Sequence, residues 1–140
     1  MFKRFMQAMR FRRADQIARE LVVPLRRCLA RFEDEDGEVA SDIRDDDFVL
    51  TYIFGAVLGR IESTGKKAKP EFAGMVLRQT LELLFGQGQE RAELCAALAR
   101  RGDEDFSYGV AIGYADVRNF KKTRAAYPTG LIEHLRVYGA

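Results

Sequence analysis

The sequence predicts an all-α fold, a single-domain bundle or orthogonal array of five to six helices. Apolar residues recur at steps of three and four through most of the chain, and no segment alternates cleanly between turn signals. A length of 140 residues with 47% hydrophobic residues suits one compact core. The charged fraction of 31% is mixed in sign and differs from the composition of a disordered chain. We therefore expect one domain over residues 1–140.

An apolar stripe between residues 17 and 32 predicts the first core-facing helix. Its members share one helix face: Ile17, Leu21, Leu25, Cys28, Leu29 and Phe32. The stripe keeps its phase across Pro24, which removes one backbone hydrogen bond and should kink or restart the helix. Both halves should therefore face the same core.

The next two helices are expected over about residues 46–63 and 70–85. The first is apolar almost all round, which is typical of a central buried helix. Acidic residues 45–47 precede it and should cap its positive end. Pro70 suits the first turn of the second helix.

Three further helices complete the prediction. One runs over about residues 89–101 and should end at Gly102, in the left-handed conformation that glycine favours. The next opens on the acidic residues 103–105 and carries an apolar stripe to Phe120, and the last covers Leu131–Tyr138.

Two of these helices contain glycines four residues apart, Gly55 with Gly59 and Gly109 with Gly113. Each glycine inside a helix costs about 1 kcal/mol relative to alanine, so four of them need a reason. Close helix contact is the interpretation we favour, and room for a bound ligand is the alternative. We expect the two helices to cross at these glycines.

Charge is distributed unevenly along the chain. Residues 1–13 form a basic amphipathic segment with five positive and no negative charges. Its cations are candidates for contact with an anion or a partner: Lys3, Arg4, Arg10, Arg12 and Arg13. Residues 33–47 hold nine acids against Arg44, and we expect a solvated acidic loop there.

The basic segment has two interpretations. On a helix, Phe2, Phe5, Met6 and Met9 fall along one side, as in a helix that lies on an anionic membrane or docks on an acidic partner. The same pattern suits a helix that covers the chain's own core and meets the acidic segment. We favour this internal docking, decided by apolar contacts, because each surface ion pair contributes only about 0.2–1 kcal/mol.

Common site motifs are absent. An EF-hand built around Gly37 would put Phe32 and Ile43 at obligatory ligand positions, two cysteines and one histidine cannot form a closed zinc site, and no phosphate-binding glycine loop occurs. His134 is expected to be a surface or interface residue, because no nucleophile accompanies it. We predict no catalytic residue, no metal site and no cofactor.

The expected location is cytoplasmic. Cys28 and Cys95 lie in apolar runs, as reduced buried cysteines do, and the longest apolar run, residues 48–59, is shorter than a membrane span. The basic start resembles a mitochondrial transit peptide but lacks serine and threonine.

The sequence thus favours a non-catalytic protein-interaction or regulatory module that binds a protein partner or self-associates. The alternatives are a peripheral binder of anionic membrane or nucleic acid through the basic segment, and an enzyme with a helical ligand site. Further basic segments lie at residues 65–69 and 119–124, but acids at 103–105 oppose a helix-turn-helix mode of DNA binding.

Overall fold

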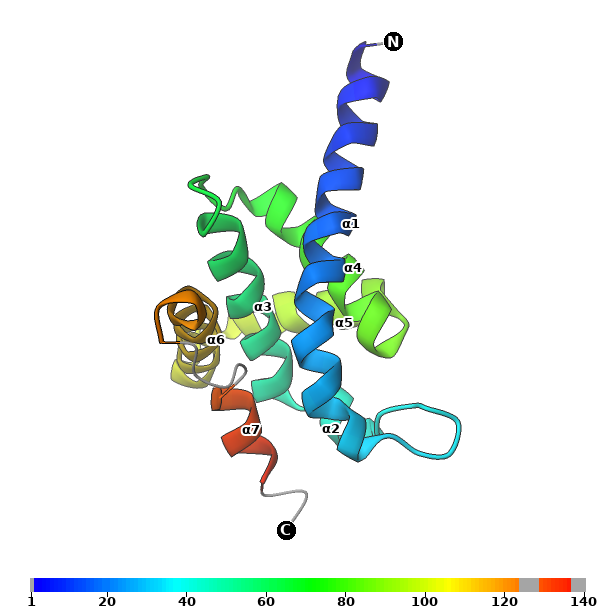
Figure 1. Ribbon diagram of the computed structural model, residues 1–140, viewed down its shortest axis with the longest axis vertical. Coiled ribbons are helices and arrows are strands. Elements are labelled where there is room, and N and C mark those ends of the chain that lie inside the picture. Colours follow the sequence, from blue (N-terminus) through cyan, green and yellow to red (C-terminus); the bar gives the residue numbers. More distant parts are fainter. Residues whose placement is uncertain (1, 124–128, 137–140) are drawn as a thin grey trace.

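The computed structural model describes residues 2–123 and 129–136, and this part of the chain is all-α (Figure 1). It forms seven α-helices and one short 3₁₀ helix, without a strand. Six of the helices correspond to those that the apolar stripes predict. The seventh, α2 (Ser41–Arg44), is a single turn inside the segment expected to be an acidic loop.

Helix α1 (Phe2–Leu29) is continuous across Pro24 and leads into the 3₁₀ helix η1 (Ala30–Phe32). The proline thus neither ends nor restarts the helix, because one lost hydrogen bond is offset by burial on both sides. The carboxyl-terminal half of α1 packs mainly on α4 (Pro70–Phe85). Its buried side chains include Ala14, Ile17, Leu21, Leu25 and Leu29.

Helix α3 (Asp47–Glu62) is the central helix of the fold, as its composition predicts. It contacts α1, α4, α5 (Gly88–Arg101), α6 (Glu104–Thr123) and α7 (Thr129–Leu135), and α6 most extensively. The side chain of Asp46 accepts a hydrogen bond from the Val49 N–H at 3.0 Å, so the predicted acidic cap is present.

The start of α4 and the end of α5 agree with their expected signals, whereas α7 differs from its predicted bounds of Leu131–Tyr138. Pro70 is in the first turn of α4, and Gly102 ends α5 with a left-handed φ of 68°. Helix α7 starts at Thr129 and ends at Leu135; residues 137 and 138 of the predicted last helix lie outside the described residues.

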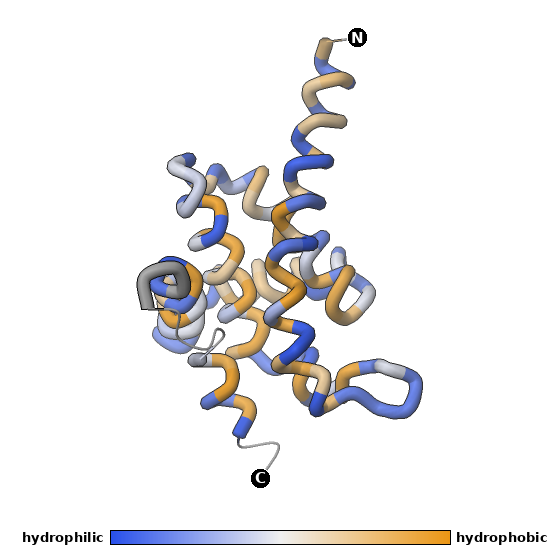
Figure 2. Tube along the Cα trace, viewed as in Figure 1, coloured by the Kyte–Doolittle hydropathy of each residue, from blue (hydrophilic) through white to orange (hydrophobic). Residues whose placement is uncertain are grey.

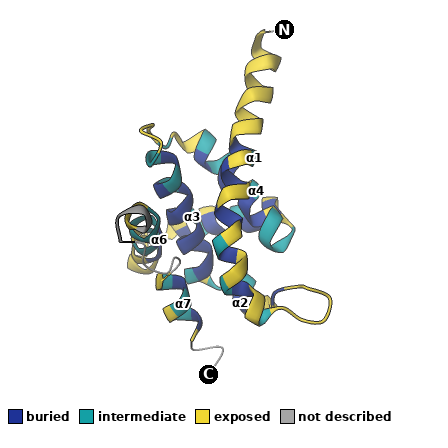
Figure 3. Cartoon of the chain, viewed as in Figure 1, coloured by how far each residue is buried: buried dark blue, intermediate teal, exposed yellow. Residues whose placement is uncertain are grey.

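The acidic segment differs in part from the expected solvated loop. Val39 and Ile43 are only 8% and 2% exposed and belong to the core, while the acids at 33–38 stay in solvent (Figure 3). The guanidinium of Arg91, itself buried, pairs with the Asp45 carboxylate. Two apolar side chains among the acids and one ion pair thus attach the segment to the fold.

Candidate binding surface

The four helical glycines lie at the crossing of α3 and α6. A Cβ atom added to Gly55 would be 2.0 Å from the Val110 carbonyl oxygen, and one added to Gly113 would be 2.0 Å from the Tyr52 carbonyl oxygen. In Figure 1 α6 is seen nearly end-on beside α3, so the two helices cross steeply. Backbone therefore faces backbone at this crossing.

The other two glycines extend the same contact. A Cβ on Gly109 would be 1.9 Å from Thr51 Oγ1, and one on Gly59 would be 2.9 Å from the Tyr114 carbonyl oxygen. The space that the glycines leave is filled by the facing helix. Helix packing therefore accounts for these glycines.

Residues 2–13 of α1 are all exposed and project from the body of the molecule (Figure 1, Figure 3). The exposed fractions are 76% for Phe2, 61% for Phe5, 40% for Met6 and 46% for Met9. The acidic segment lies near the opposite end of α1. The internal docking that we favoured from the sequence is therefore wrong for this structure.

Helix geometry explains this outcome. At 3.6 residues per turn, the stripe through Phe2 and Met9 is rotated by roughly 130° from the stripe that α1 buries further along. Since α1 is one continuous helix through both stripes, only one of them can face the core. Figure 2 shows apolar and polar residues interleaved in the projecting part.

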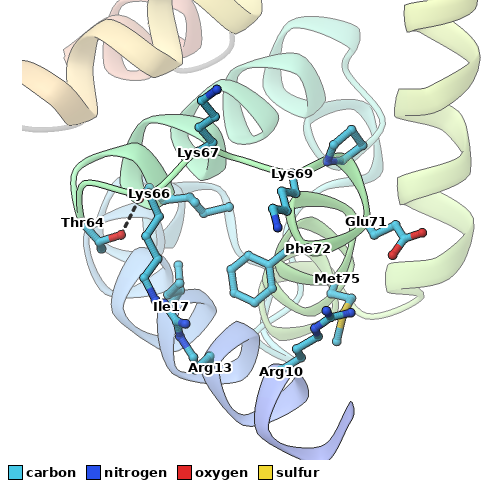
Figure 4. Close-up of a pocket in the computed structure, with 12 residues that line it drawn as sticks. Arg10, Arg13, Ile17, Thr64, Lys66, Lys67, Lys69, Glu71, Phe72 and Met75 are labelled. Atoms are coloured by element: carbon cyan, nitrogen blue, oxygen red, sulfur yellow. Dashed lines mark hydrogen bonds between the residues drawn. The ribbon is translucent and has the colours of Figure 1, made fainter. Parts of the chain in front are cut away.

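Beside this projecting part lies an open groove of about 940 Å³ between α1, the connection from α3 to α4, and the start of α4. Arg10 and Arg13 line it from α1, and Lys66, Lys67 and Lys69 line it from the connection. In Figure 4 Lys67 points away from the ring of Phe72, and the other four of these side chains surround it. The groove thus joins two basic segments that are far apart in the sequence.

The electrostatics of the groove are one-sided. In the part of the chain that the structure describes, none of these four cations is in an ion pair. The Arg13 guanidinium lies 5.8 Å from the centroid of the Phe72 ring, a cation–π distance. The acidic Glu71 also lines the groove, but its side chain points away from Phe72 in Figure 4.

The other predicted contact residues do not share this groove. Lys3, Arg4 and Arg12 are exposed elsewhere on the projecting part of α1. Sequence reasoning found the basic segments separately and assigned Phe72 to the core stripe of its helix. No local sequence pattern predicts that the two basic segments and Phe72 line one groove, because this depends on how α1 packs beside α4.

His134 has a structural role. Its Nε2 lies 3.0 Å from Asp46 Oδ1, and its ring stacks on Phe48 with the centroids 4.3 Å apart. These contacts connect α7 to the start of α3. The histidine thus lies at an internal interface between helices.

The cysteines do not resemble nucleophiles. Burial raises the pKa of Cys28 and of Cys95 to about 11 in each case, so both thiols are protonated near neutral pH. Among the described residues there is no group of three or more histidines, cysteines or acids that could hold a metal ion. Within the same residues, no helix has both the length and the apolar character needed to cross a membrane.

Comparisons with protein-family models, with curated proteins and with solved structures gave no match to this chain.

Proposed function

We propose that this chain is a non-catalytic binding module whose docking element is residues 2–13 of α1, and that it docks on an anionic membrane surface. The observation that supports this proposal is the exposed apolar stripe on a strongly basic helix end. The broader predictions of a protein-interaction module and of self-association stay predictions.

The stripe has the features of an interfacial helix. Phe2, Phe5, Met6 and Met9 are exposed along one side, and five Lys or Arg residues accompany them within residues 2–13. Apolar side chains of this kind enter the boundary between lipid headgroups and acyl chains, and each nearby Lys or Arg adds about 1 kcal/mol of attraction to an anionic leaflet. The two contributions act on the same segment.

The distribution of charge along the molecule favours one orientation on such a surface. The projecting end of α1 and the connection that holds Lys66 and Lys69 lie at one end of the molecule (Figure 1). The exposed acids of residues 33–38 lie toward the other end. An anionic surface therefore attracts the basic end and repels the acidic one.

Other partners satisfy fewer of these features. A nucleic-acid duplex would pair with the cations but offers little to exposed Phe2 and Met6, since its backbone is polar. Two copies docked through residues 2–13 would bring ten cations together, because each copy contributes five. An acidic protein remains the competitor that the experiment must separate.

Vesicle co-sedimentation tests the proposal. We expect the full chain to bind vesicles that contain phosphatidylserine, to lose that binding at high salt, and not to bind neutral phosphatidylcholine vesicles. The variant Phe2→Ala/Phe5→Ala should bind weakly at low salt. The matched control, Val23→Ala/Leu94→Ala, removes exposed apolar side chains elsewhere and should bind like the unmodified chain.

Two results would contradict the proposal. One is the absence of binding to anionic vesicles at low salt, and the other is equal loss of binding in the test variant and the control. Tighter binding to duplex DNA or to an acidic polypeptide than to the vesicles would replace the membrane with that partner.

A further inference from the structure

We propose that the groove beside α1 binds the phosphorylated headgroup of an anionic membrane lipid. The inference rests on the proposed membrane function and adds to it a headgroup class and a specific site. General attraction to an anionic surface needs no groove, so the two proposals make different predictions.

The first argument is the convergence of positive charge without compensation. Arg10 and Arg13 extend from α1, and Lys66 and Lys69 face them across the groove (Figure 4). No ion pair neutralises these four side chains in the described part of the chain. Like charges that line one concave surface raise its potential, and a multiply charged anion relieves their repulsion.

The second argument concerns which anion fits. Lysine and arginine bind phosphate oxygens through charge-assisted hydrogen bonds, and a phosphate monoester offers three such oxygens at close quarters. The headgroup of phosphatidylserine offers only one phosphodiester and one carboxylate, each with a single negative charge, to the cations that line the groove. A ring that bears several phosphates can contact cations on both sides of the groove.

The third argument concerns the floor of the groove. Phe72, Met75 and Ile17 line it together with the cations, so an occupant meets apolar as well as charged surface. The Arg13 guanidinium is already placed over the Phe72 ring, which limits the freedom that binding would cost it. The carbon face of a phosphorylated ring matches this arrangement.

The fourth argument is position. Arg13 is four residues beyond Met9 and lies on the same side of α1, so the groove adjoins the apolar docking stripe. When that stripe enters the boundary of the lipid headgroups, the groove comes to the level of the headgroups themselves. A lipid is therefore a better occupant than a free phosphate compound.

The test compares two vesicle compositions of equal total negative charge, one with phosphatidylserine and one with a phosphoinositide bisphosphate. We expect the full chain to bind the phosphoinositide vesicles about tenfold more tightly. The variant Lys66→Ala/Lys69→Ala should lose this preference yet still bind both vesicles. Lys69 precedes α4 without a side-chain capping bond, so the variant should fold.

The control is Arg100→Ala/Arg101→Ala, which removes the same charge from an exposed site on α5 and should keep the preference. Soluble inositol trisphosphate should compete with the phosphoinositide vesicles and not with the phosphatidylserine vesicles, which tests the groove without any variant.

The outcomes separate the two proposals. Equal binding to both vesicle types, or equal effects of the variant and its control, would overturn the groove assignment while the membrane function stands. Binding of soluble inositol trisphosphate without binding to any vesicle would overturn both the membrane function and the lipid assignment, and would leave a site for a free phosphate compound.

Discussion

The crossing of α3 and α6 differs from the projecting end of α1 in its surroundings, since the crossing is an internal contact between helices and the end of α1 is exposed to solvent. At the crossing the two helix backbones are so close that a Cβ atom added to Gly113 would lie 2.0 Å from the Tyr52 carbonyl oxygen. At the projecting end, large side chains are exposed to solvent, and the exposed fraction of Phe2 is 76%. Changes at the crossing should therefore alter stability, and changes at the end should alter binding.

The largest effect is expected from Gly113→Ala. The new methyl group cannot coexist with the Tyr52 carbonyl oxygen, so α6 must move from α3, and the free energy of unfolding should fall by about 3 kcal/mol. Urea unfolding measures this. The matched control is Gly74→Ala in α4, where a Cβ meets nothing within 4 Å, and it should stabilise by about 0.5–1 kcal/mol. Equal responses at the two sites would refute the packing role of Gly113.

A somewhat smaller loss is expected from Asp45→Ala, which tests how the acidic segment is held. Arg91 is only 4% exposed, and the substitution removes the carboxylate that pairs with its guanidinium. Carbonyl oxygens of Gly86 and Arg44 still accept from Arg91, so we expect a loss of about 1–3 kcal/mol in urea unfolding. Asp36→Ala, in the exposed part of the same segment, is the control. An unchanged midpoint for Asp45→Ala would mean that the segment is not anchored there.

Tyr52→Phe should cost about 1–2 kcal/mol. The Tyr52 hydroxyl donates to Asp116 Oδ2 at 2.6 Å, and the same oxygen accepts from the Gly130 N–H at 2.8 Å, which joins α3, α6 and α7. Removing the hydroxyl leaves the carboxylate with one donor fewer. Tyr108→Phe, at a residue 62% exposed, should leave the thermal midpoint unchanged. If the thermal midpoints of both variants equal that of the unmodified chain, the hydrogen bond from Tyr52 to Asp116 does not contribute to stability.

The smallest effect on stability is expected from removing residues 1–13. Residues 2–13 are exposed, and the contact of Arg13 with Phe72 is a single cation–π pair, so the unfolding free energy should change by less than about 0.5 kcal/mol. Thermal melts of the full chain and of the chain from Ala14, at low and high salt, measure this. A drop of several degrees that salt partly reproduces would restore the internal docking that the structure does not show.

Local patterns predicted most of the secondary structure. The proline at the start of α4, the glycine at the end of α5 and the acid before α3 each act on the nearest turn of backbone, so their effects can be inferred without knowing the fold. The sequence does not predict the turn α2, because the nine acids of its segment indicate a solvated loop. The burial of Ile43 in that turn depends on tertiary packing.

Some features of the candidate site can likewise be predicted from local sequence, and others cannot. Its charges and its apolar stripe are visible in residues 2–13, and the basic connection is visible at residues 65–69. That Arg13 and Lys66 share one groove is not visible in the sequence, since 53 positions separate them. The place of Phe72 in a core stripe also does not indicate that its half-buried ring, packed against the core, lines the groove as well.

The fold class, most helix ends and the close contact at the paired glycines can be inferred from neighbouring residues, because helical periodicity, capping and the lack of a side chain are local properties. The exposure of the basic segment depends instead on how the helices pack. The continuous helix α1 presents one side to the core, and the rotation of roughly 130° between its two apolar stripes leaves the amino-terminal stripe in solvent. That stripe lies beside a groove that α4 and the preceding connection complete.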